Sequence, residues 1–514
     1  MEGTIAYELA KKQKEISVSE FFSKNRAMLG FDNPQKALFI SVKEAVDNSL
    51  DACEEAKILP DIIVKVSEVK NGLYSVCVED NGPGILPEQI PLIFGKLLYG
   101  SRFHTRKQTR GQQGIGISGA VLYSNLTTGH GAIVESSIGK GKPTYKFEVS
   151  VDLHKNQPRF KKLNESFNSR AHGTRIEILV KGAYRRGERS IDSYIEQTVT
   201  ANPWLTLTYI NPEGKKVVYQ RSSNQLPPEP KEIPIHPHGI DVGELMLLLR
   251  LSSHKKLRSF LIETFSRIST TSVEKIGAIS GVNLSKKPSK IDLEEAKRLV
   301  SAFKKIKFIR PPTDCLSPIG PDLIEKGILR VHDVDFVAKS IREPTVYSGN
   351  PFLIECGLGY GGELPRENRV KILRFANRVP LLYQEGADVI THTIEKIDWR
   401  KYGLNQPGGK GIPHGPALIM VHVASVYVPF TSEAKEAIGN ITEIAKEIRL
   451  GLQECGRQLR IYLSKKRREE KLKERADWVR EYVPLILQKA AEITGEEAPD
   501  PTPIIHRILG RPLE

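Results

Sequence analysis

The chain is poor in cysteine and has no long apolar run, and each absence excludes a class of protein. Its five cysteines lie far apart among 514 residues, and none forms a C-x-x-C pair. A disulfide framework and a cysteine zinc site are therefore excluded. The longest apolar stretch, 416–430, is interrupted by His422, and residues 1–15 lack the apolar segment of a signal peptide. We therefore expect a cytoplasmic protein with reduced thiols and no membrane partner.

The size and charge of the chain point to several domains and a polyanionic partner. At 514 residues and 39% hydrophobic content, the sequence predicts roughly three packed domains of about 150 residues each. The formal net charge is +15, and residues 235–310 hold 15 Lys and Arg against 7 Asp and Glu. More than half of the excess therefore lies in one block. Nucleic-acid contact is expected there, with an ordinary solvated face as the alternative.

Two proline-rich segments divide the chain. Residues 222–239 contain five prolines, and a second break follows at 309–321. Strand-like and helical runs mix before the first break, helical periodicity fills the middle block, and strands alternate with helices afterwards. The sequence thus predicts an α+β protein. Its expected parts are an N-terminal domain at 1–230, a helical domain at 235–310, a third domain at 311–475 and a tail at 476–514.

From Thr431 onward the sequence predicts one long helix. Its apolar residues recur at alternating steps of three and four, which is a heptad seam. The seam consists of Ile438, Ile441, Ala445, Ile448, Leu452, Cys455, Leu459 and Tyr462. Such a helix either packs on its own domain or serves as a stiff lever or partner surface, and the pattern does not separate the two.

The stretch GQQGIGISG, 111–119, has four glycines in nine positions. So much backbone freedom is entropically costly, which indicates a tight turn or a close approach to a ligand. From Gly114 it matches the dinucleotide fingerprint, but no apolar strand precedes it and no acidic residue follows about twenty positions later. The Walker pattern fails as well, because no Lys-Ser/Thr pair follows the glycines. Alone, the stretch identifies no fold.

A second stretch, SVKEAVDNSLDAC at 41–53, predicts an amphipathic helix. Apolar residues mark one face, whereas Glu44, Asn48 and Asp51 lie at i, i+4 and i+7 on the other. A carboxylate and a carboxamide one turn apart can hold a water and a hard metal ion such as Mg²⁺. An ordinary solvated polar face is the alternative.

A third stretch, VEDNGPGI at 78–85, predicts a strand that ends in an aspartate. Gly82 and Gly84 follow Asp80 at once, so a base could approach the backbone while Asp80 accepts a hydrogen bond from an exocyclic amine. A plain turn is the alternative interpretation of this stretch.

In this order and spacing the three stretches resemble the Bergerat-fold (GHKL) ATPases. That superfamily includes type II DNA topoisomerases, MutL repair proteins, heat-shock chaperones and sensor histidine kinases. HGTRIEI, 172–178, resembles a fourth motif of the family. The resemblance implies an α/β sandwich ATPase domain that uses ATP and Mg²⁺, with the glycine stretch as a lid whose amides wrap the phosphates.

The resemblance also implies roles for individual residues. Glu44 would act as general base or water orienter, Asn48 would bind Mg²⁺, and Asp80 would recognise the adenine amine. The other nucleotide-binding residues that it implies are Gly82, Gly84, Ser101, Arg102, Gly111, Gln112, Gln113, Gly114, Ile115, Gly116, Ile117, Ser118 and Thr174.

In topoisomerases and MutL proteins a second domain supplies a cation to the γ-phosphate. VPFTSEAKEAI, 428–438, resembles the family's switch loop, so the resemblance implies that Lys435 fills this role. A lysine suits it as a point charge for phosphate. Lys410 is the weaker candidate, and a merely solvated lysine is the alternative for both.

The order of domains resembles the B-subunit family of type IIB DNA topoisomerases (topoisomerase VI) over nearly the whole chain. ISVSEFFSKNRAMLGFDNP, GQQGIGISGA and VPFTSEAKEAI carry this resemblance. It implies that 235–310 is a helix-two-turns-helix domain with Lys286, Lys287 and Lys290 on DNA phosphates. It further implies that 311–475 is a transducer α/β domain with a long C-terminal helix.

The same resemblance implies partners. A separate A subunit would supply the tyrosine and the metal site for cleavage, in an A2B2 heterotetramer that binds double-stranded DNA and associates with the nucleoid. ATP would dimerise the N-terminal domains, with residues 1–25 exchanged between copies, and drive duplex passage that relaxes and decatenates DNA. The tail would bind the A subunit through Trp478, Tyr482, Leu485, Ile486 and Ile493. The alternatives are a MutL-like ATP-gated repair clamp and a chaperone ATPase.

Overall fold

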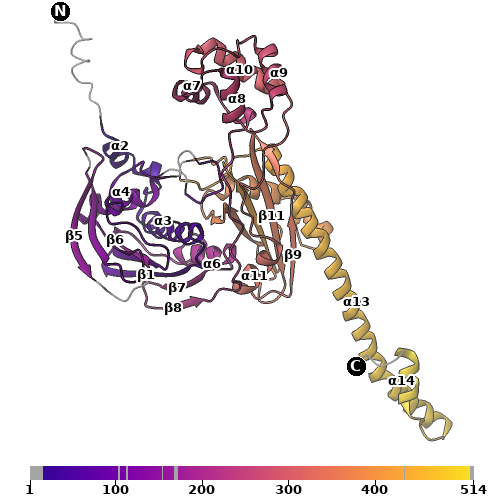
Figure 1. Ribbon diagram of the computed structural model, residues 1–514. Helices are drawn as coiled ribbons and strands as arrows, with labels where there is room; N and C mark the ends of the chain where they lie inside the picture. The colour runs from indigo at the N-terminus through magenta and orange to yellow at the C-terminus, as the bar shows by residue number, and fades with distance from the viewer. Residues whose placement is uncertain are drawn as a thin grey trace, which may run out of the picture.

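The computed structural model describes residues 16–101, 105–111, 114–152, 154–166, 172–432 and 434–509. Two mixed sheets, a helical bundle and one long helix make up this part of the chain (Figure 1). The predicted α+β class is confirmed. The expectations for Arg102, Gln112, Gln113 and residues 1–15 of the exchanged segment lie outside the described residues.

The first sheet has eight strands in the order β5-β4-β3-β6-β2-β1-β7-β8. Neighbours pair antiparallel except β1 and β7, which are parallel. The strands are β1 (Asp61–Lys70), β2 (Leu73–Asp80), β3 (Ala132–Ser137), β4 (Thr144–Val151), β5 (Pro158–Ser166), β6 (Gly173–Lys181), β7 (Thr206–Ile210) and β8 (Lys216–Tyr219). Burial alternates strictly along β2, so one face of the sheet forms a core.

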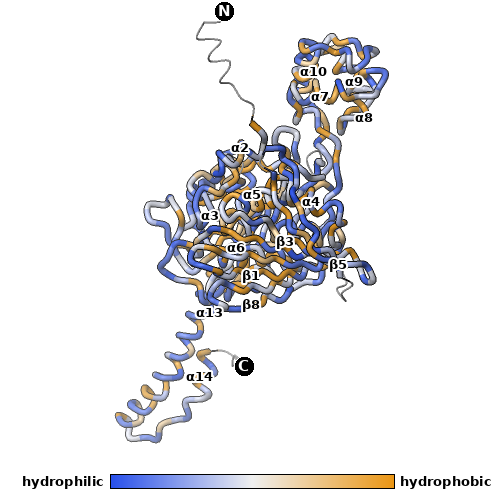
Figure 2. The backbone as a smooth tube through the Cα atoms, turned by 90° about the vertical axis from the view of Figure 1, so that its left-hand side faces the viewer, coloured by the Kyte–Doolittle hydropathy of each residue, from blue (hydrophilic) through white to orange (hydrophobic). Residues whose placement is uncertain are grey.

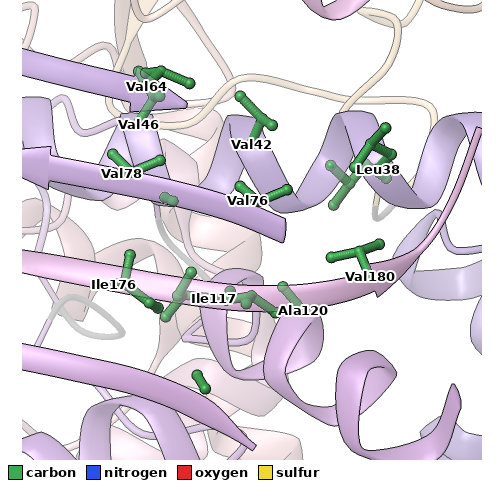
Figure 3. Close-up of a cluster of buried hydrophobic side chains, with 14 of the residues drawn as sticks. Leu38, Val42, Val46, Val64, Val76, Val78, Ile117, Ala120, Ile176 and Val180 are labelled. Carbon is green, nitrogen blue, oxygen red and sulfur yellow. The ribbon is translucent and has the colours of Figure 1, made fainter. Parts of the chain in front are cut away.

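Helices cover that face. They are α2 (Val18–Lys24), α3 (Pro34–Glu55), α4 (Ile90–Gly95), α5 (Gly116–Thr128) and α6 (Ile191–Ala201), with a 3₁₀ turn, η1 (Arg26–Leu29). Helix α3 begins where the side chain of Asn33 accepts the Lys36 N–H and Pro34 fixes the first turn. Figure 3 shows the resulting core between α3, α5 and strands β1, β2 and β6. Its labelled members are Leu38, Val42, Val46, Val64, Val76, Val78, Ile117, Ala120, Ile176 and Val180.

A separate helical bundle, the insert, follows the proline-rich linker and lies at the top of Figure 1. It contains α7 (Val242–Leu251), α8 (Leu257–Thr264), α9 (Thr270–Ser280) and α10 (Leu293–Lys305), with η2 (Pro237–Gly239) and η3 (Pro288–Lys290). Its helices enclose a core of their own, centred on Phe260 and Phe303. At the start of α10, Asp292 and Glu295 form a capping box.

The second sheet has the order β10-β11-β14-β12-β13, and β9 also pairs with β11. Its strands are β9 (Phe336–Ile341), β10 (Thr345–Tyr347), β11 (Asn350–Tyr360), β12 (Lys371–Ala376), β13 (Val379–Pro380) and β14 (Ala417–Ser425). It is accompanied by α11 (Pro321–Val331), α12 (Val389–Lys396), η4 (Glu385–Ala387), η5 (Trp399–Tyr402) and η6 (Pro407–Gly409).

Both faces of this second sheet are covered. Along β14, Leu418 and Met420 join the core cluster that contains residues of α11, whereas Ile419 and Val421 join the cluster that contains residues of the long helix. Every residue of β14 is buried. This explains why the sequence there reads as one apolar run rather than as an alternating pattern.

The predicted start of the long helix is wrong. Helix α13 spans Thr442–Thr494, eleven residues later than expected at its N-terminal end. Instead, Ile438 pairs with Phe430 as an isolated bridge, and its N–H donates to Asp388 at 2.8 Å. These tertiary hydrogen bonds outweigh the helical periodicity of the sequence. At its other end α13 stops at Gly495 in the left-handed conformation, and α14 (Pro501–Leu509) packs back against it (Figure 1).

The heptad seam packs on its own domain. Ile448, Leu452, Cys455 and Leu459 are fully buried in the core beside the second sheet. The C-terminal part of α13 projects away from the body, and hydrophobic and hydrophilic residues mix along it (Figures 1 and 2). Among the helices of the described ranges, none is both long and apolar enough to cross a membrane. All five cysteines are free thiols.

Substitutions on the long helix test whether the heptad seam packs on its own domain. Leu459→Ala removes a side chain with no exposure and should lower the free energy of unfolding by about 2–5 kcal/mol. Ile461→Ala, two residues later and 68% exposed, is the matched control and should change it by less than about 0.5 kcal/mol. Urea unfolding of the two variants gives the comparison. Equal stability of the two would contradict the packing of the seam on the sheet.

Candidate functional site

The parts that contain the first and second sheets are called the first and second domains. A cavity of about 840 Å³ lies between the helices of the first domain and two loops of the second. One wall consists of α3, the end of β2, the start of α5 and the start of β6. Residues 380–383 and 434–436 close it from the second domain. Segments more than 300 positions apart in the chain therefore share one site.

Most of the predicted nucleotide residues line this cavity. They are Glu44, Asn48, Asp80, Gly84, Ser101, Gly111, Gly114, Ile115, Gly116, Ile117, Ser118, Thr174 and Lys435. Gly82 does not line it, but its N–H donates to Asp80 from behind. Lys410 does not line it either and is exposed next to η6.

Asp80 is fixed by hydrogen bonds from three parts of the fold. Its carboxylate accepts the hydroxyl of Ser49 on α3 at 2.8 Å, the N–H of Gly82 at 2.9 Å and the N–H of Thr174 on β6 at 3.1 Å. The hydroxyl of Thr174 in turn bonds that of Ser136 at 3.1 Å. Bonds to an ionised acceptor are among the stronger ones, so the carboxylate is held in one orientation at the cavity wall.

Glu44 is a half-buried carboxylate held beside a lysine. The ammonium of Lys43 lies 3.0 Å from Glu44 and 3.0 Å from Asp47, and Tyr194 donates its hydroxyl to Asp47 at 2.9 Å. Burial opposes the charge of Glu44, but Lys43 and then Lys435 outweigh it and lower the carboxyl pKa below its ordinary value. Glu44 is therefore ionised at neutral pH and can accept a hydrogen bond from water.

Lys435 reaches the same cavity from the loop before α13. Its backbone is left-handed, with φ of 54°, which is uncommon for a residue other than glycine. The next residue anchors the loop: Glu436 lies 2.5 Å from the ammonium of Lys36 and accepts the amide of Gln384 at 2.6 Å. Burial lowers the pKa of Lys435, although Glu44 opposes this effect.

The glycine stretch is only partly a loop. Gly114 has a φ of 61°, but helix α5 already begins at Gly116, so the last four residues of the stretch are helical. A Cβ at Gly116 would overlap Oε2 of Glu44. No side chain caps this helix at Ile115. Its first N–H groups thus remain available to an anion in the cavity.

The predicted polar face of α3 is divided in two. Asn48 is exposed to the cavity one turn after Glu44. Asp51 is buried instead, and its carboxylate lies 2.8 Å from the guanidinium of Arg110. The i+7 position therefore belongs to a different contact, which the helical spacing alone could not reveal.

Sequence reasoning missed several residues of the site. Lys43 could have been suspected, because it is adjacent to Glu44 and lies at i, i+4 from Asp47. No local signal marks residues 380–383 of the second domain, and only the tertiary fold brings them to the cavity. Phe22, Met28 and Leu29 near the N-terminus add an apolar wall that was not predicted either.

The three lysines predicted to contact DNA differ in their surroundings. Lys286 is half-buried, and its ammonium lies 2.6 Å from Glu295. Lys287 and Lys290 are exposed on either side of the buried Pro288. The last two are therefore available to an anionic partner, whereas Lys286 is already paired.

Two families match the chain. Residues 33–180 match the histidine kinase-, DNA gyrase B- and HSP90-like ATPases, and residues 311–475 match the topoisomerase VI B-subunit transducer. The first match bears out the expected Bergerat fold and shows that the chain binds ATP.

Related proteins match over the full length. The B subunit of type 2 DNA topoisomerase 6 from Methanococcoides burtonii is 49% identical over 515 residues, covering 100% of this chain and 82% of the relative. The protein of the same name from Archaeoglobus fulgidus is 44% identical, covering 98% and 83%. Among solved structures, the B-subunit of the DNA gyrase from Myxococcus xanthus aligns with 84% of this chain and 93% of its own at 11% identity, with a TM-score of 0.40.

The contact between α5 and Glu44 predicts the effect of a methyl group. Gly116→Ala should destabilise the first domain by about 1–3 kcal/mol, because the helix start or the carboxylate must shift. Gly119→Ala on the same helix is the matched control. Its Cβ would meet Leu29 at an ordinary 3.4 Å, and alanine favours a helix by up to about 1 kcal/mol. Urea unfolding gives the free energy of unfolding of both variants. Equal stability of Gly116→Ala and Gly119→Ala would contradict the close contact of Gly116 with Glu44.

Proposed function

This chain belongs to the family of type 2 DNA topoisomerase 6 B subunits, and we propose that its cavity is the ATP site that gates duplex passage. As a family member it is the ATPase subunit of an ATP-dependent type II DNA topoisomerase. The observation that carries the proposal is that Glu44 of the first domain and Lys435 of the second border one cavity. Hydrolysis and domain movement would then depend on the same phosphate.

The adenine would lie at the Asp80 end of the cavity. A carboxylate that already accepts hydrogen bonds from Ser49, Gly82 and Thr174 is rigid, so it can accept the exocyclic amine without reorganising. The triphosphate would lie at the start of α5. There the uncapped helix N-terminus and the amides around Gly114 favour an anion.

Glu44 would orient and deprotonate the attacking water. Its lowered pKa keeps it ionised at neutral pH, and Lys43 holds its carboxylate in place. Lys435 would contribute a positive charge where negative charge develops on the γ-phosphate. In this proposal Glu44 acts on the attacking water and Lys435 acts on the γ-phosphate.

Asn48 fits a magnesium ion carried by the phosphates. Mg²⁺ takes few protein oxygens and keeps several waters beside phosphate. Across the described ranges no group of three or more His, Cys, Asp or Glu could hold a metal ion by itself. The carboxamide oxygen of Asn48, exposed to the cavity, is a suitable single protein ligand. The ion would neutralise phosphate charge during hydrolysis.

Phosphate contact at Lys435 would move the second domain and close the gate. We propose that ATP dimerises the N-terminal domains of two copies, with residues 1–25 exchanged, around a captured duplex. The domain limits that we propose are 1–230, 235–310, 311–475 and 476–514. Helix α13 crosses residue 475 without a break, so it could pass the movement into the tail.

The tail would bind the A subunit in an A2B2 assembly. The tail lies at the projecting end of the molecule (Figure 1). The apolar side chains predicted to bind the partner are exposed there, where a partner could cover them. Trp478 is 57% exposed, Leu485 53%, Ile486 59% and Ile493 84%. We also propose a cytoplasmic location at the nucleoid, where the DNA substrate lies.

In the insert, Lys287 and Lys290 would contact DNA phosphates, and Lys286 would support them through Glu295. Replacing both exposed lysines should make DNA binding less dependent on salt, by about one counterion for each lost contact. An unchanged salt dependence would remove these residues from the interface.

Reconstitution with the A subunit tests the proposed function. The tagged chain is isolated from its native lysate, and the co-purifying protein with a catalytic tyrosine and an acidic metal cluster is identified and added back. We expect ATP-dependent relaxation of supercoiled DNA, and none with Glu44→Ala, which should still bind ATP and dimerise. Recovery of repair proteins or unfolded proteins alone, without relaxation, would favour the MutL-like clamp or the chaperone instead.

Lys435→Ala should lower the rate of ATP hydrolysis without weakening the binding of ADP. Turnover should fall by about 100-fold, because a charge on the γ-phosphate is lost, while ADP affinity stays within about threefold. Lys410→Ala is the matched control in the same domain, since this lysine is exposed and off the cavity. Steady-state hydrolysis and ADP titration give both values. A parallel loss of ADP affinity would contradict the γ-phosphate contact.

A further inference from the structure

The six residues before the glycine stretch, 105–110, are tied to every neighbouring domain. Arg106 lies 2.7 Å from Glu244 of the insert. Gln108 exchanges two hydrogen bonds with the backbone of Ser317, at 2.6 and 3.0 Å. The backbone carbonyl of Thr109 accepts the amide of Asn377 from the second sheet at 3.0 Å. A segment that leads directly into the lid is therefore held from outside its own domain.

The strongest of these ties is a buried charge cluster centred on Glu54. One carboxylate oxygen of Glu54 lies 2.7 Å from the guanidinium of Arg110, and the other lies 2.7 Å from that of Arg378. Arg110 also contacts Asp51 at 2.8 Å. The side chain of Arg110 has no exposure, that of Arg378 6% and that of Glu54 12%. One carboxylate of α3 thus joins the base of the lid to the second domain.

The charges in this cluster balance, and that makes it sensitive to movement. Two carboxylates, Asp51 and Glu54, face two guanidinium groups. Burial opposes the charge of Glu54, but Arg110 and Arg378 keep its carboxyl pKa below the ordinary value. Withdrawal of Arg378 would leave a buried excess of negative charge, which is strongly unfavourable. The position of the second domain and the arrangement at Glu54 are therefore energetically linked.

Arg378 occupies a position that an arginine adopts only at a cost. Arg378 and Asn377 form the two-residue turn between β12 and β13. Both have positive φ, which is 67° at Arg378 and 48° at Asn377. Turns of this kind favour glycine at the second position. A buried partner sustains the strained conformation: the Arg378 N–H donates to Nε2 of His422, whose Nδ1 contacts Glu355 at 2.7 Å. Such strain at a domain contact points to a function.

A small cavity lies where the base of the lid, the turn between β12 and β13 and the loop of Lys435 meet. It is lined by Thr109 and Arg110 at the base of the lid, by Asn377 of the turn, and by Lys43 and Lys435 beside Glu44. The turn that carries Arg378 is therefore next to the loop that carries the phosphate-sensing lysine. A shift of the turn would therefore change the surroundings of the loop, and a shift of the loop would change those of the turn.

We propose that Arg378 is a positioning residue for ATP hydrolysis, which sets the lid through Glu54 and Arg110 and makes lid and transducer depend on each other. The inference rests on the proposed function in one respect, that the glycine stretch is the lid of the ATP site. By linkage, the nucleotide would reposition the transducer through the same contact by which the transducer positions the lid.

Hydrogen exchange in the full chain tests the link directly. With a non-hydrolysable ATP analogue, the wild-type protein should gain protection both in 105–119 and in 371–381. In Arg378→Gln, the analogue should still protect 114–119, but the response of 371–381 should be lost. A response of both segments in this variant would overturn the proposal. Absence of any response in the wild type would instead contradict the ATP site itself, so the two failures are distinguishable.

The matched control is Arg374→Gln. Arg374 lies on β12, just before the turn that carries Arg378. It is 4% exposed and faces Asp388 at 3.5 Å, but this partner belongs to its own domain. In the complex with the A subunit, Arg378→Gln should lower the number of supercoils relaxed per ATP by at least about fivefold. Arg374→Gln should lower DNA relaxation and ATP hydrolysis together, as loss of folded protein does. The number of supercoils relaxed per ATP should therefore stay unchanged. Equal ratios in the two variants would overturn the proposal.

A conservative variant covers the case in which Arg378→Gln fails to fold. Arg378→Lys keeps the positive charge beside Glu54 but cannot also reach Ser317, which the guanidinium contacts at 2.6 Å. We expect it to retain the response of 371–381 and at least half of the ratio. Loss of both in a folded Arg378→Lys protein, which keeps the charge beside Glu54, would overturn the proposal without any need for the glutamine variant.

Discussion

The structure depends on the charge of Glu44. An ammonium is costly to bury unless a carboxylate lies nearby, and Lys435 is half-buried on a loop of the second domain. Glu44 supplies the compensating charge from α3, and Lys43 keeps it ionised. Beside this pair, Lys36 of the first domain contacts Glu436 of the second at 2.5 Å, next to the point where a nucleotide would be hydrolysed. A ligand with a charge of its own at this point must alter that balance, so binding and domain position cannot be independent.

The layout of the first sheet brings the other groups to the same place. Helices α3 and α5 cover one face, which places the polar edge of α3, the start of α5 and the start of β6 around the end of β2. Gly116 permits the closest of these approaches, because any side chain there would overlap Glu44. The second sheet has the opposite requirement. It is covered on both faces, and Ala201 and Trp204 of the first domain join the core on one of them. Its loops reach the cavity.

The elements with local signals were predictable from the sequence, and those made by tertiary contacts were not. Helix α3, the end of β2 at Asp80 and the start of β6 near Thr174 follow from periodicity and turn residues. The start of α13 was misjudged because Asp388, fifty positions earlier, binds Ile438 and keeps it extended. The partner of Asp51 was not predictable for the same reason, since Arg110 comes from another element. Helical spacing shows which residues share a face but not what covers that face.

The position of Lys435 on a strained loop, rather than on the helix that follows, has a physical consequence. A lysine inside α13 could respond to a phosphate only if the whole helix moved, because the seam from Ile448 to Leu459 is packed in the core. On the loop, the left-handed Lys435 is only half-buried and lies outside this packed seam, while Glu436 beside it contacts Lys36 of the first domain. Adjacent residues of the loop therefore differ in what they contact, since Glu436 binds the first domain and Lys435 lines the cavity. Under the proposed function, Glu436 would keep the domains in register and Lys435 would detect the ligand. A small displacement at the phosphate can then be converted into rotation of a rigid helix, since the loop ends only a few residues before α13 begins.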